Sequence, residues 1–448
     1  MTSSPNAQLS EAEWLARARH YILSTRMDAR SAHGPVLVRG EGSVVWDTEG
    51  RQYLDFNSGQ MCAALGHQPH RVVEAIRQAC DTLIHASSSI LNVYEISLAE
   101  RLAALTPYGL TRSLFLESGA DANEAAVQLA KVHTGRTHVA SPHVSFHGLS
   151  DSTRALTFGV RDWHRGYGPY AYGNHAIMAP YCYRCPIRRS FPECQLVCLD
   201  ATFELLDAEL DSPLAAVITE PLFSAGGVIE PPEGWLVALK RKCEERGALL
   251  ILDEAQTGLG KLGTMWACEP AQVIPDILTI SKHFGGGVSI SAVVTTDEIA
   301  DRAQAAGFVH GHSHTSDPLA CAAAEASLET IVEEDLPGRA VSLGAEWRGR
   351  LESLARQHPV IGDIRGRGLI QGVELVRDRT TREPADGLGW EVERFCRQEG
   401  LLFSVRRAGT VLRFVPPWTT TTQQFERAAF ILDAGLRASA PGPSTVGE

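Results

Sequence analysis

Apolar runs and amphipathic stretches alternate along most of the chain. Residues 214–221 (LAAVITEP) and 248–255 (ALLILDEA) are continuous apolar runs that each end at a carboxylate, which is typical of strands buried on both faces. Residues 70–83 and 122–135 instead repeat apolar positions with helical spacing. This alternation predicts an α/β fold with a mostly parallel sheet and a ligand site beyond the carboxyl ends of its strands.

The pattern divides the chain into successive parts. Residues 1–68 read as an N-terminal helix followed by a β-meander, and residues 69–318 as a large domain. A long alanine-rich helix opens the next part, so residues 319–440 are expected to form a smaller C-terminal α+β domain. Residues 441–448 are expected to be a disordered tail. A cysteine-rich insertion at about 180–200 interrupts the large domain.

Composition narrows the classes of function. The formal charge of −12 disfavours a nucleic-acid partner, because phosphate backbones are bound by basic surfaces. No apolar run reaches the roughly 18 residues that a membrane helix needs, and the N-terminal residues lack the apolar core of a signal peptide. We therefore expect no membrane partner and a cytoplasmic location.

The strongest chemical signal lies between residues 250 and 287 (LILDEAQTGLGKLG…PDILTISKHFGGG). Asp253 ends one predicted buried strand, and Lys282 follows a second and precedes a glycine run. Both side chains are thus expected at the rim where a ligand lies. Pyridoxal phosphate (PLP) needs such a pair, with a lysine to form an imine and a carboxylate to keep the pyridine nitrogen protonated.

These residues also carry a resemblance to a known family. Residues 250–287, FLESGADANEAAVQLAK, VSFHG, AVITEPLFSAGGVIEPP and IGDIRGRGLIQGVEL resemble class III aminotransferases of PLP fold type I, in family order over essentially the whole chain. The resemblance implies a large domain with a mostly parallel seven-stranded sheet, a smaller C-terminal α+β domain, and amino transfer between an amino acid or amine and a keto acid. SGQMCAALGH and EPADGLG are most similar to the 2,2-dialkylglycine decarboxylase branch, which couples decarboxylation to transamination.

Two other functions stay open beside amino transfer. One is a different carbanion reaction of PLP on an amino-acid substrate. The other is a non-catalytic metal-binding scaffold, which the intact Lys282 and Asp253 disfavour.

The resemblance assigns roles to individual positions. Lys282 carries the cofactor and shuttles protons, Asp253 pairs with the pyridinium nitrogen, and Gln256 lies near the phenolic oxygen. A homodimer, or a dimer of dimers, is implied because Ser313 matches a phosphate ligand that reaches the partner's site. The remaining implied contacts are Ser118, Gly119 and Ala120 for the phosphate, Phe146, His147 and Glu220 around the ring, and Gln60 and Arg413 for the substrate.

Two positions depart from the decarboxylase pattern. That branch has tryptophan at the position of Phe146 and serine at the position of Ala225. Each missing donor is worth about 1–3 kcal/mol to a bound anion. The hypothesis is therefore that decarboxylation is weakened relative to transamination.

The sequence also offers two candidate metal sites. Cys182, Cys185, Cys194 and Cys198 follow the spacing C-x2-C-x8-C-x3-C, which suits zinc or an iron–sulfur cluster, reduced thiols, or disulfides. The resemblance further implies an alkali cation, with oxygen ligands from Ser88, Ser313, Thr315 and Asp317. The alternative for the segment Ser316–Asp317–Pro318 is a plain helix N-cap. Six further cysteines are scattered singly and are expected to be small buried hydrophobes: Cys62, Cys80, Cys243, Cys268, Cys321 and Cys396.

Overall fold

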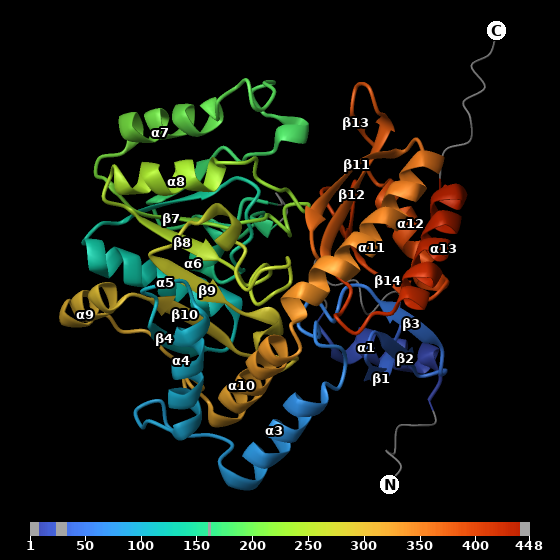
Figure 1. The fold of residues 1–448 in the computed structure, drawn as a ribbon, viewed down its shortest axis with the longest axis horizontal. Helices are drawn as coiled ribbons and strands as arrows, with labels where there is room; N and C mark the ends of the chain where they lie inside the picture. Colours follow the sequence, from blue (N-terminus) through green and yellow to red (C-terminus); the bar gives the residue numbers. More distant parts are fainter. Residues whose placement is uncertain (1–8, 24–33, 160–162, 440–448) are drawn as a thin grey trace.

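The computed structural model of the 448-residue chain describes residues 9–23, 34–159 and 163–439 (Figure 1). The tail predicted at residues 441–448 lies outside these described residues.

A seven-stranded sheet forms the centre of the large domain, in the order β4-β10-β9-β8-β7-β5-β6. Only β10 runs antiparallel to its neighbours, which confirms the prediction of a mostly parallel seven-stranded sheet. Its strands are β4 (Arg112–Leu116), β5 (His138–Pro142), β6 (Asn174–Ile177), β7 (Leu214–Thr219), β8 (Leu249–Asp253), β9 (Ile277–Ile280) and β10 (Ser291–Thr295).

Helices cover both faces of this sheet (Figure 1). Along β8, Leu250 and Leu252 pack into one hydrophobic cluster and Ile251 into another, because successive side chains of a strand point to opposite faces. The helices between residues 70 and 333 are α3 (His70–Thr82), α4 (Val93–Leu105), α5 (Gly119–Thr134), α6 (Asp151–Arg154), α7 (Val197–Glu209), α8 (Trp235–Glu244), α9 (Asp297–Ala305) and α10 (Pro318–Glu333), with short 3-10 turns η2 (Cys182–Arg184), η3 (Glu269–Ala271) and η4 (Lys282–Gly285).

The C-terminal part is an antiparallel sheet of order β11-β12-β16-β15, with β13 paired to β12 and helices packed against it. Figure 1 shows it in orange and red beside the large domain. Its elements are α11 (Leu336–Gln357), β11 (Ile361–Arg367), β12 (Ile370–Asp378), β13 (Glu383–Pro384), α12 (Leu388–Gln398), β14 (Leu401–Leu402), β15 (Ser404–Arg406), β16 (Val411–Phe414) and α13 (Thr422–Ser439).

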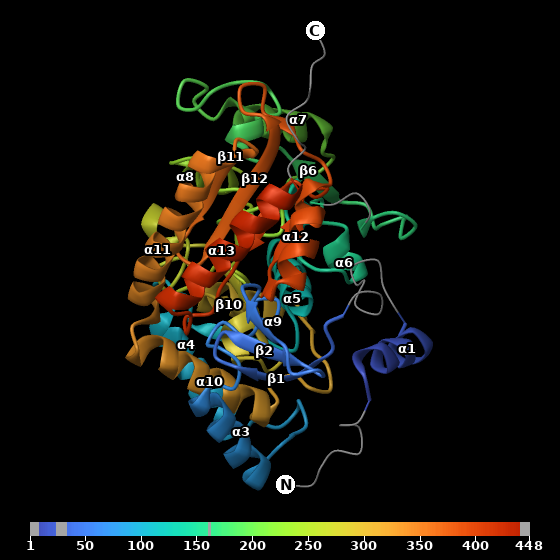
Figure 2. The same ribbon diagram turned by 90° about the vertical axis from the view of Figure 1, so that its right-hand side faces the viewer.

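The N-terminal segment joins the C-terminal part although the two are far apart in sequence. After α1 (Glu11–Tyr21), the meander β1 (Leu37–Glu41), β2 (Val44–Asp47) and β3 (Gln52–Asp55) is extended by β14, which pairs in parallel with β3. Figure 2 shows the blue meander below the red and orange helices. No helix in the described ranges is both long and apolar enough to cross a membrane.

A buried ionic network ties the cysteine-rich segment to the C-terminal sheet. The Glu374 carboxylate, on β12, is fully buried and accepts hydrogen bonds from Tyr181 and Arg184. Arg365, on β11, approaches the same carboxylate at 2.6 Å. Burial opposes ionisation, yet the pKa of Glu374 is lowered, because Arg365 and the other donors stabilise the charged carboxylate.

Replacing Glu374 with alanine should remove one of the two carboxylates that pair with the buried Arg365, the other being Asp363. Breaking such a pair costs about 3–5 kcal/mol, so Glu374→Ala should lower the urea midpoint of unfolding strongly. The control is Glu383→Ala, since Glu383 pairs with Arg377 at 3.6 Å and both side chains are more than half exposed. That variant should change stability by less than about 0.5 kcal/mol. Similar midpoints for the two variants would show that the network does not hold the parts together.

Candidate functional site

Asp253 is the best-connected polar group at the carboxyl end of the central sheet. It is the last residue of β8 and only 4% exposed. Its Oδ2 accepts from Asn123 Nδ2 at 2.7 Å and contacts His147 Nδ1 at 2.8 Å, and its Oδ1 accepts from the amide of Ala255 at 3.0 Å. No Lys or Arg nitrogen in the described ranges lies within 4.0 Å of this carboxylate. It therefore presents a buried negative charge that neutral donors and a histidine hold in place.

Asn123 and His147 are themselves fixed by the surrounding strands and helix. Asn123 lies on α5, donates to the carbonyl of His147 at 2.9 Å and accepts from Thr279, on β9, at 2.6 Å. His147 Nε2 contacts the Ser141 hydroxyl, at the end of β5, at 3.1 Å. Our sequence reasoning did not identify Asn123. A polar residue on the buried face of the alanine-rich α5 was the available signal.

The first turn of α5 lies next to the same rim. Ser118 caps the helix by accepting from the amide of Asp121, whose carboxylate accepts from Ser118 in return. Because the first amides of a helix have no partner within it, the N–H groups of Gly119 and Ala120 can serve a ligand. A Cβ on Gly119 would lie 3.3 Å from Cβ of Ser281, which is closer than an ordinary van der Waals contact. Glycine at this position therefore lets the start of α5 lie close to the residue that follows β9.

Lys282 follows β9 after one intervening residue, Ser281, and opens η4 in a left-handed backbone conformation with φ of 57°. Glu220, at the end of β7, lies beside it. Burial raises the pKa of Glu220 well above its ordinary value and Asp253 raises it further, whereas the Lys282 ammonium opposes this rise. Glu220 Oε1 accepts from the amide of Phe146 at 2.9 Å, and its buried Oε2 has no hydrogen-bond partner among the described residues. Lys282, Glu220 and Asp253 thus converge at the ends of adjacent strands.

Arg413 brings a guanidinium from the C-terminal sheet to this rim. It is 1% exposed, and its Nη1 donates to Gln256 at 3.2 Å and to Ser224 at 3.1 Å. Its Nε donates to Ser404 at 2.9 Å. Burial lowers the pKa of Arg413 well below its ordinary value, and the charge of Arg406 lowers it further, whereas Glu220 opposes the shift. Ser224 and Ser404 are contacts that the sequence did not indicate.

The structure shows fewer contacts for Gln60, Phe146 and Ala225, the three other positions discussed for the substrate and the ring. Gln60 is exposed with φ of 64°, and its carbonyl accepts from the Cys62 thiol. Burial raises the pKa of Cys62 while Lys282 lowers it, which puts this segment near the lysine. The Phe146 ring packs edge-on against the Trp163 ring, with 4.9 Å between the ring centroids. Ala225 is buried, with 7% of its surface exposed.

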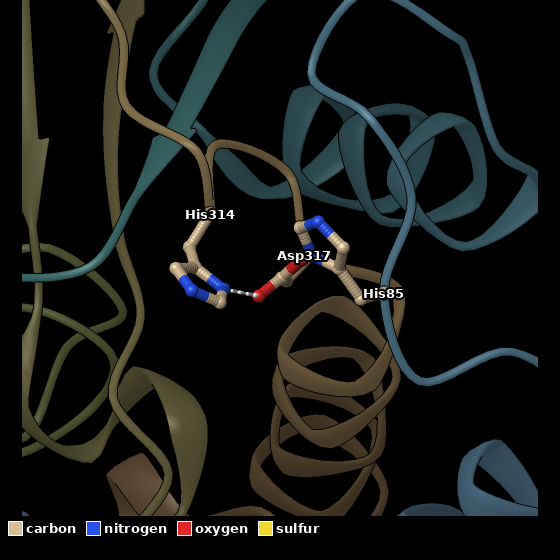
Figure 3. Close-up of side chains that lie close together, drawn as sticks. All are labelled: His85, His314 and Asp317. Carbon is tan, nitrogen blue, oxygen red and sulfur yellow. Dashed lines mark hydrogen bonds and ion pairs between the residues drawn. The ribbon is translucent and has the colours of Figure 1, made fainter.

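The proposed alkali-cation residues have other partners here. Figure 3 shows His314 beside the Asp317 carboxylate, with His85 close by. Asp317 contacts the Nδ1 of both histidines, at 2.5 Å for His85. The Thr315 hydroxyl accepts from the amide of His312 at 2.8 Å, while Ser88 and Ser313 are exposed. Asp317 and Thr315 are thus engaged by groups of the protein, and the cation site stays a prediction. Asp317 is also the N-cap residue of α10 with proline following, although its side chain makes no capping hydrogen bond.

The four clustered cysteines are all free thiols, so the structure contains no disulfide between them. Partial burial, and then the other three thiols, raise the pKa of Cys182 to about 11. No three of these sulfur atoms lie within 4.8 Å of one another in the described chain. Of the six scattered cysteines, Cys80 is exposed and Cys62 is half-buried, against the prediction that all are buried, while the other four are buried as expected.

Comparison with known proteins places this geometry in a family. The family model "Aminotransferase class-III" matches residues 27–436. An uncharacterized aminotransferase of Schizosaccharomyces pombe is 38% identical over 90% of this chain and 91% of its own. A leucine/methionine racemase of Thermococcus litoralis is 35% identical over 91% of this chain and 92% of its own. The crystal structure of a taurine:2-oxoglutarate aminotransferase from Bifidobacterium kashiwanohense, in complex with PLP and glutamate, aligns with a TM-score of 0.89 and 26% identity over 96% of this chain and 98% of its own.

The Asn123 contacts can be tested by stability. Asn123→Ala should leave the Asp253 and Thr279 partners buried with one hydrogen bond fewer each. Each such loss costs about 1–3 kcal/mol, so the urea midpoint of unfolding should fall. The control Asn174→Ala removes one contact to the Ala171 carbonyl at the surface and should change the midpoint little. Equal midpoints for wild type and Asn123→Ala would mean that the network around Asp253 does not depend on Asn123.

Proposed function

Because this chain belongs to the class III aminotransferases, we propose that its site transfers an amino group between an amino acid or amine and a keto acid through Lys282. The family itself makes the protein a PLP-dependent transaminase with amino and keto substrates. The observation that supports the residue assignment is the buried Asp253 carboxylate at the end of β8, beside the strand β9 that leads to Lys282.

The residues present fit PLP. The amides of Gly119 and Ala120 suit its phosphate dianion, since helix N-termini carry unpaired N–H groups and a positive dipole end. Asp253 suits the protonated ring nitrogen, because contacts with His147 and Asn123 fix the position of its carboxylate. Gln256 and Phe146 are proposed beside the ring.

The bound cofactor supplies an electron-withdrawing ring that stabilises negative charge at the substrate Cα. The protein's own groups supply the rest. We propose that the Lys282 amine removes and returns the proton at Cα, as a general base and acid. The Arg413 guanidinium, held by Ser404 and Ser224, would bind the substrate carboxylate and orient the Cα–H bond.

Lys282→Ala should abolish amino transfer while leaving the fold intact. A positioned acid–base group contributes about 10²- to 10⁴-fold on its own, and loss of the anchoring amine adds to this. The measurement is keto-acid formation from an amino-acid panel, with circular dichroism to verify folding. Lys242→Ala is the control, because Lys242 pairs with Asp200 at 2.6 Å on α7 and α8, away from the strand ends. Wild-type rates in Lys282→Ala would end this assignment.

A second candidate function is decarboxylating transamination. Gln60 remains available to hold a leaving carboxylate, but the structure has a half-buried Phe146 and a buried Ala225 where the decarboxylase branch has donors. Losing these donors removes about 1–3 kcal/mol each from the stabilisation of that carboxylate. We therefore propose that removal of the Cα proton is favoured over decarboxylation. A different carbanion reaction, such as the racemisation named for the Thermococcus relative, would use the same Lys282 proton transfer.

The test compares 2-aminoisobutyrate with L-alanine, measuring carbon dioxide and keto acid separately. Keto acid from L-alanine should form faster than carbon dioxide from 2-aminoisobutyrate. The double variant Ala225→Ser/Phe146→Trp should raise the share of decarboxylation by roughly one to four orders of magnitude. Wild-type carbon dioxide release that matches the alanine reaction would show that the two positions do not control the outcome.

We also propose a homodimer and a metal-binding role for the cysteine cluster. A homodimer in which Ser313 serves the partner's phosphate is consistent with the exposure of Ser313 in the single chain. Zinc or iron–sulfur binding by the cysteine cluster would require its sulfur atoms to move closer together, since zinc–thiolate bonds are only about 2.3 Å long. In that case the metal would stabilise a loop rather than take part in amino transfer.

A further inference from the structure

Two histidines and an aspartate converge where the turn before α10 meets the connection between α3 and α4 (Figure 3). His85 lies in that connection, whereas His314 and Asp317 lie in the turn. One ligand atom from each of the three side chains lies within 4.8 Å of the other two. Since Asp317 is 232 positions beyond His85 in the sequence, only the fold brings these groups together.

The Asp317 carboxylate bridges the two imidazoles. Its Oδ1 contacts His85 Nδ1 at 2.5 Å, and its Oδ2 contacts His314 Nδ1. The centroids of the two imidazole rings are 5.0 Å apart, and the ring planes are inclined at 54°. Both salt bridges that Asp317 makes among the described residues are with these imidazoles. Two ring nitrogens and a carboxylate are therefore gathered around one point.

This group is open to solvent. The side chain of His314 is 61% exposed and that of His85 is 46% exposed, whereas that of Asp317 is 17% exposed. His314 and Asp317 also line a cavity of about 270 Å³. A hydrated ion can thus reach the three side chains, and the exposed imidazoles have room to turn around it.

The donor set selects a class of metal. Imidazole nitrogens and a carboxylate oxygen suit zinc and related divalent transition metals, whereas an alkali cation takes oxygen ligands. The set therefore differs in chemistry from the oxygen ligands that the family resemblance implies around Asp317. Zinc bonds of about 2.0–2.2 Å place tetrahedral ligands about 3.4 Å apart, so side-chain shifts of roughly 1 Å would close the present spacing.

We propose that His85, His314 and Asp317 bind one zinc-type divalent metal ion, with water from the adjoining cavity in the fourth coordination position. Each imidazole uses the nitrogen that now contacts the carboxylate, and metal binding releases the proton held in that contact to solvent. The bound ion joins the segment after α3 to the turn before α10. It thereby holds in place the turn that carries Ser313.

The experiment titrates zinc into the untagged, PLP-loaded protein by calorimetry after treatment with a chelator. Wild type should bind zinc, and His85→Ala and His314→Ala should each weaken this binding by at least roughly 10- to 100-fold, because loss of an outer contact of a metal ligand already costs that much. The matched control is His70→Ala, since His70 is an exposed histidine at the start of α3 and this variant keeps all three ligands. A wild type that binds no zinc, or wild-type affinity in either ligand variant, would overturn the proposal.

A neighbouring group provides a second control. His312 Nε2 lies 3.8 Å from one carboxylate oxygen of Glu117 and 3.8 Å from one of Asp121. This group offers a single imidazole, so His312→Ala should bind zinc as wild type does. Loss of the zinc in His312→Ala, with retention in the His85 and His314 variants, would assign the metal to that group and contradict the proposal.

X-ray absorption identifies the ligands directly and needs no change to them. The measurement uses Cys182→Ser/Cys185→Ser protein, so that the cysteine cluster does not compete for the metal. Zinc should have nitrogen and oxygen neighbours at about 2.0–2.2 Å with the scattering pattern of imidazole, whereas remaining thiolates would lie at about 2.3 Å. Excess potassium should not displace this zinc. A spectrum without imidazole, or displacement by potassium, would contradict the proposed site.

Discussion

The buried Asp253 carboxylate is the constraint on which the site depends. A charge in this position is costly unless polar groups surround it, and here α5, the loop that holds His147 and the turn after β8 provide them. Asn123 links the carboxylate to α5 and β9, and His147 links it to the end of β5. The orientation of the proposed cofactor site is therefore set by the same contacts that pack α5 onto the sheet.

The C-terminal part contributes charge of the opposite sign. Arg413 enters the rim from β16 and is held by hydroxyl and amide oxygens rather than by a carboxylate. A guanidinium left without an acid in a buried place is suited to binding an acid from solvent. The Glu374 network shows the other solution, because there the protein supplies the counter-ion and the contact holds two parts of the chain together. An arginine with its own carboxylate, such as Arg365, stabilises the fold, whereas an arginine without one, such as Arg413, is suited to binding a ligand.

The parallel arrangement of β7, β8 and β9 explains why acidic side chains and Lys282 lie at the same rim. Because parallel strands place their carboxyl ends at one edge, Glu220, Asp253 and the Lys282 segment after β9 reach the same rim. The single antiparallel strand, β10, returns beside β9 and lets Ser291 bond the carbonyl of Ser118 at 2.7 Å. That contact joins Ser118, the N-cap of α5, to β10, which neighbours the strand β9 that precedes Lys282.

The sequence by itself determined the fold class, the strand ends at Asp253 and Glu220, and the lysine after β9, because continuous apolar runs that stop at a charge mark buried parallel strands. It could not identify Asn123, Ser224 or Ser404 as partners, since isolated polar residues in a helix or loop have no local signal for a distant contact. It likewise gave no signal for the contacts that His85 and His314 make with the Asp317 carboxylate. The burial of Arg413 and the separation of the cysteine sulfurs were decided only by tertiary structure. The physical reason is that pairing between distant segments, and not local pattern, sets which charges are desolvated and which find a partner.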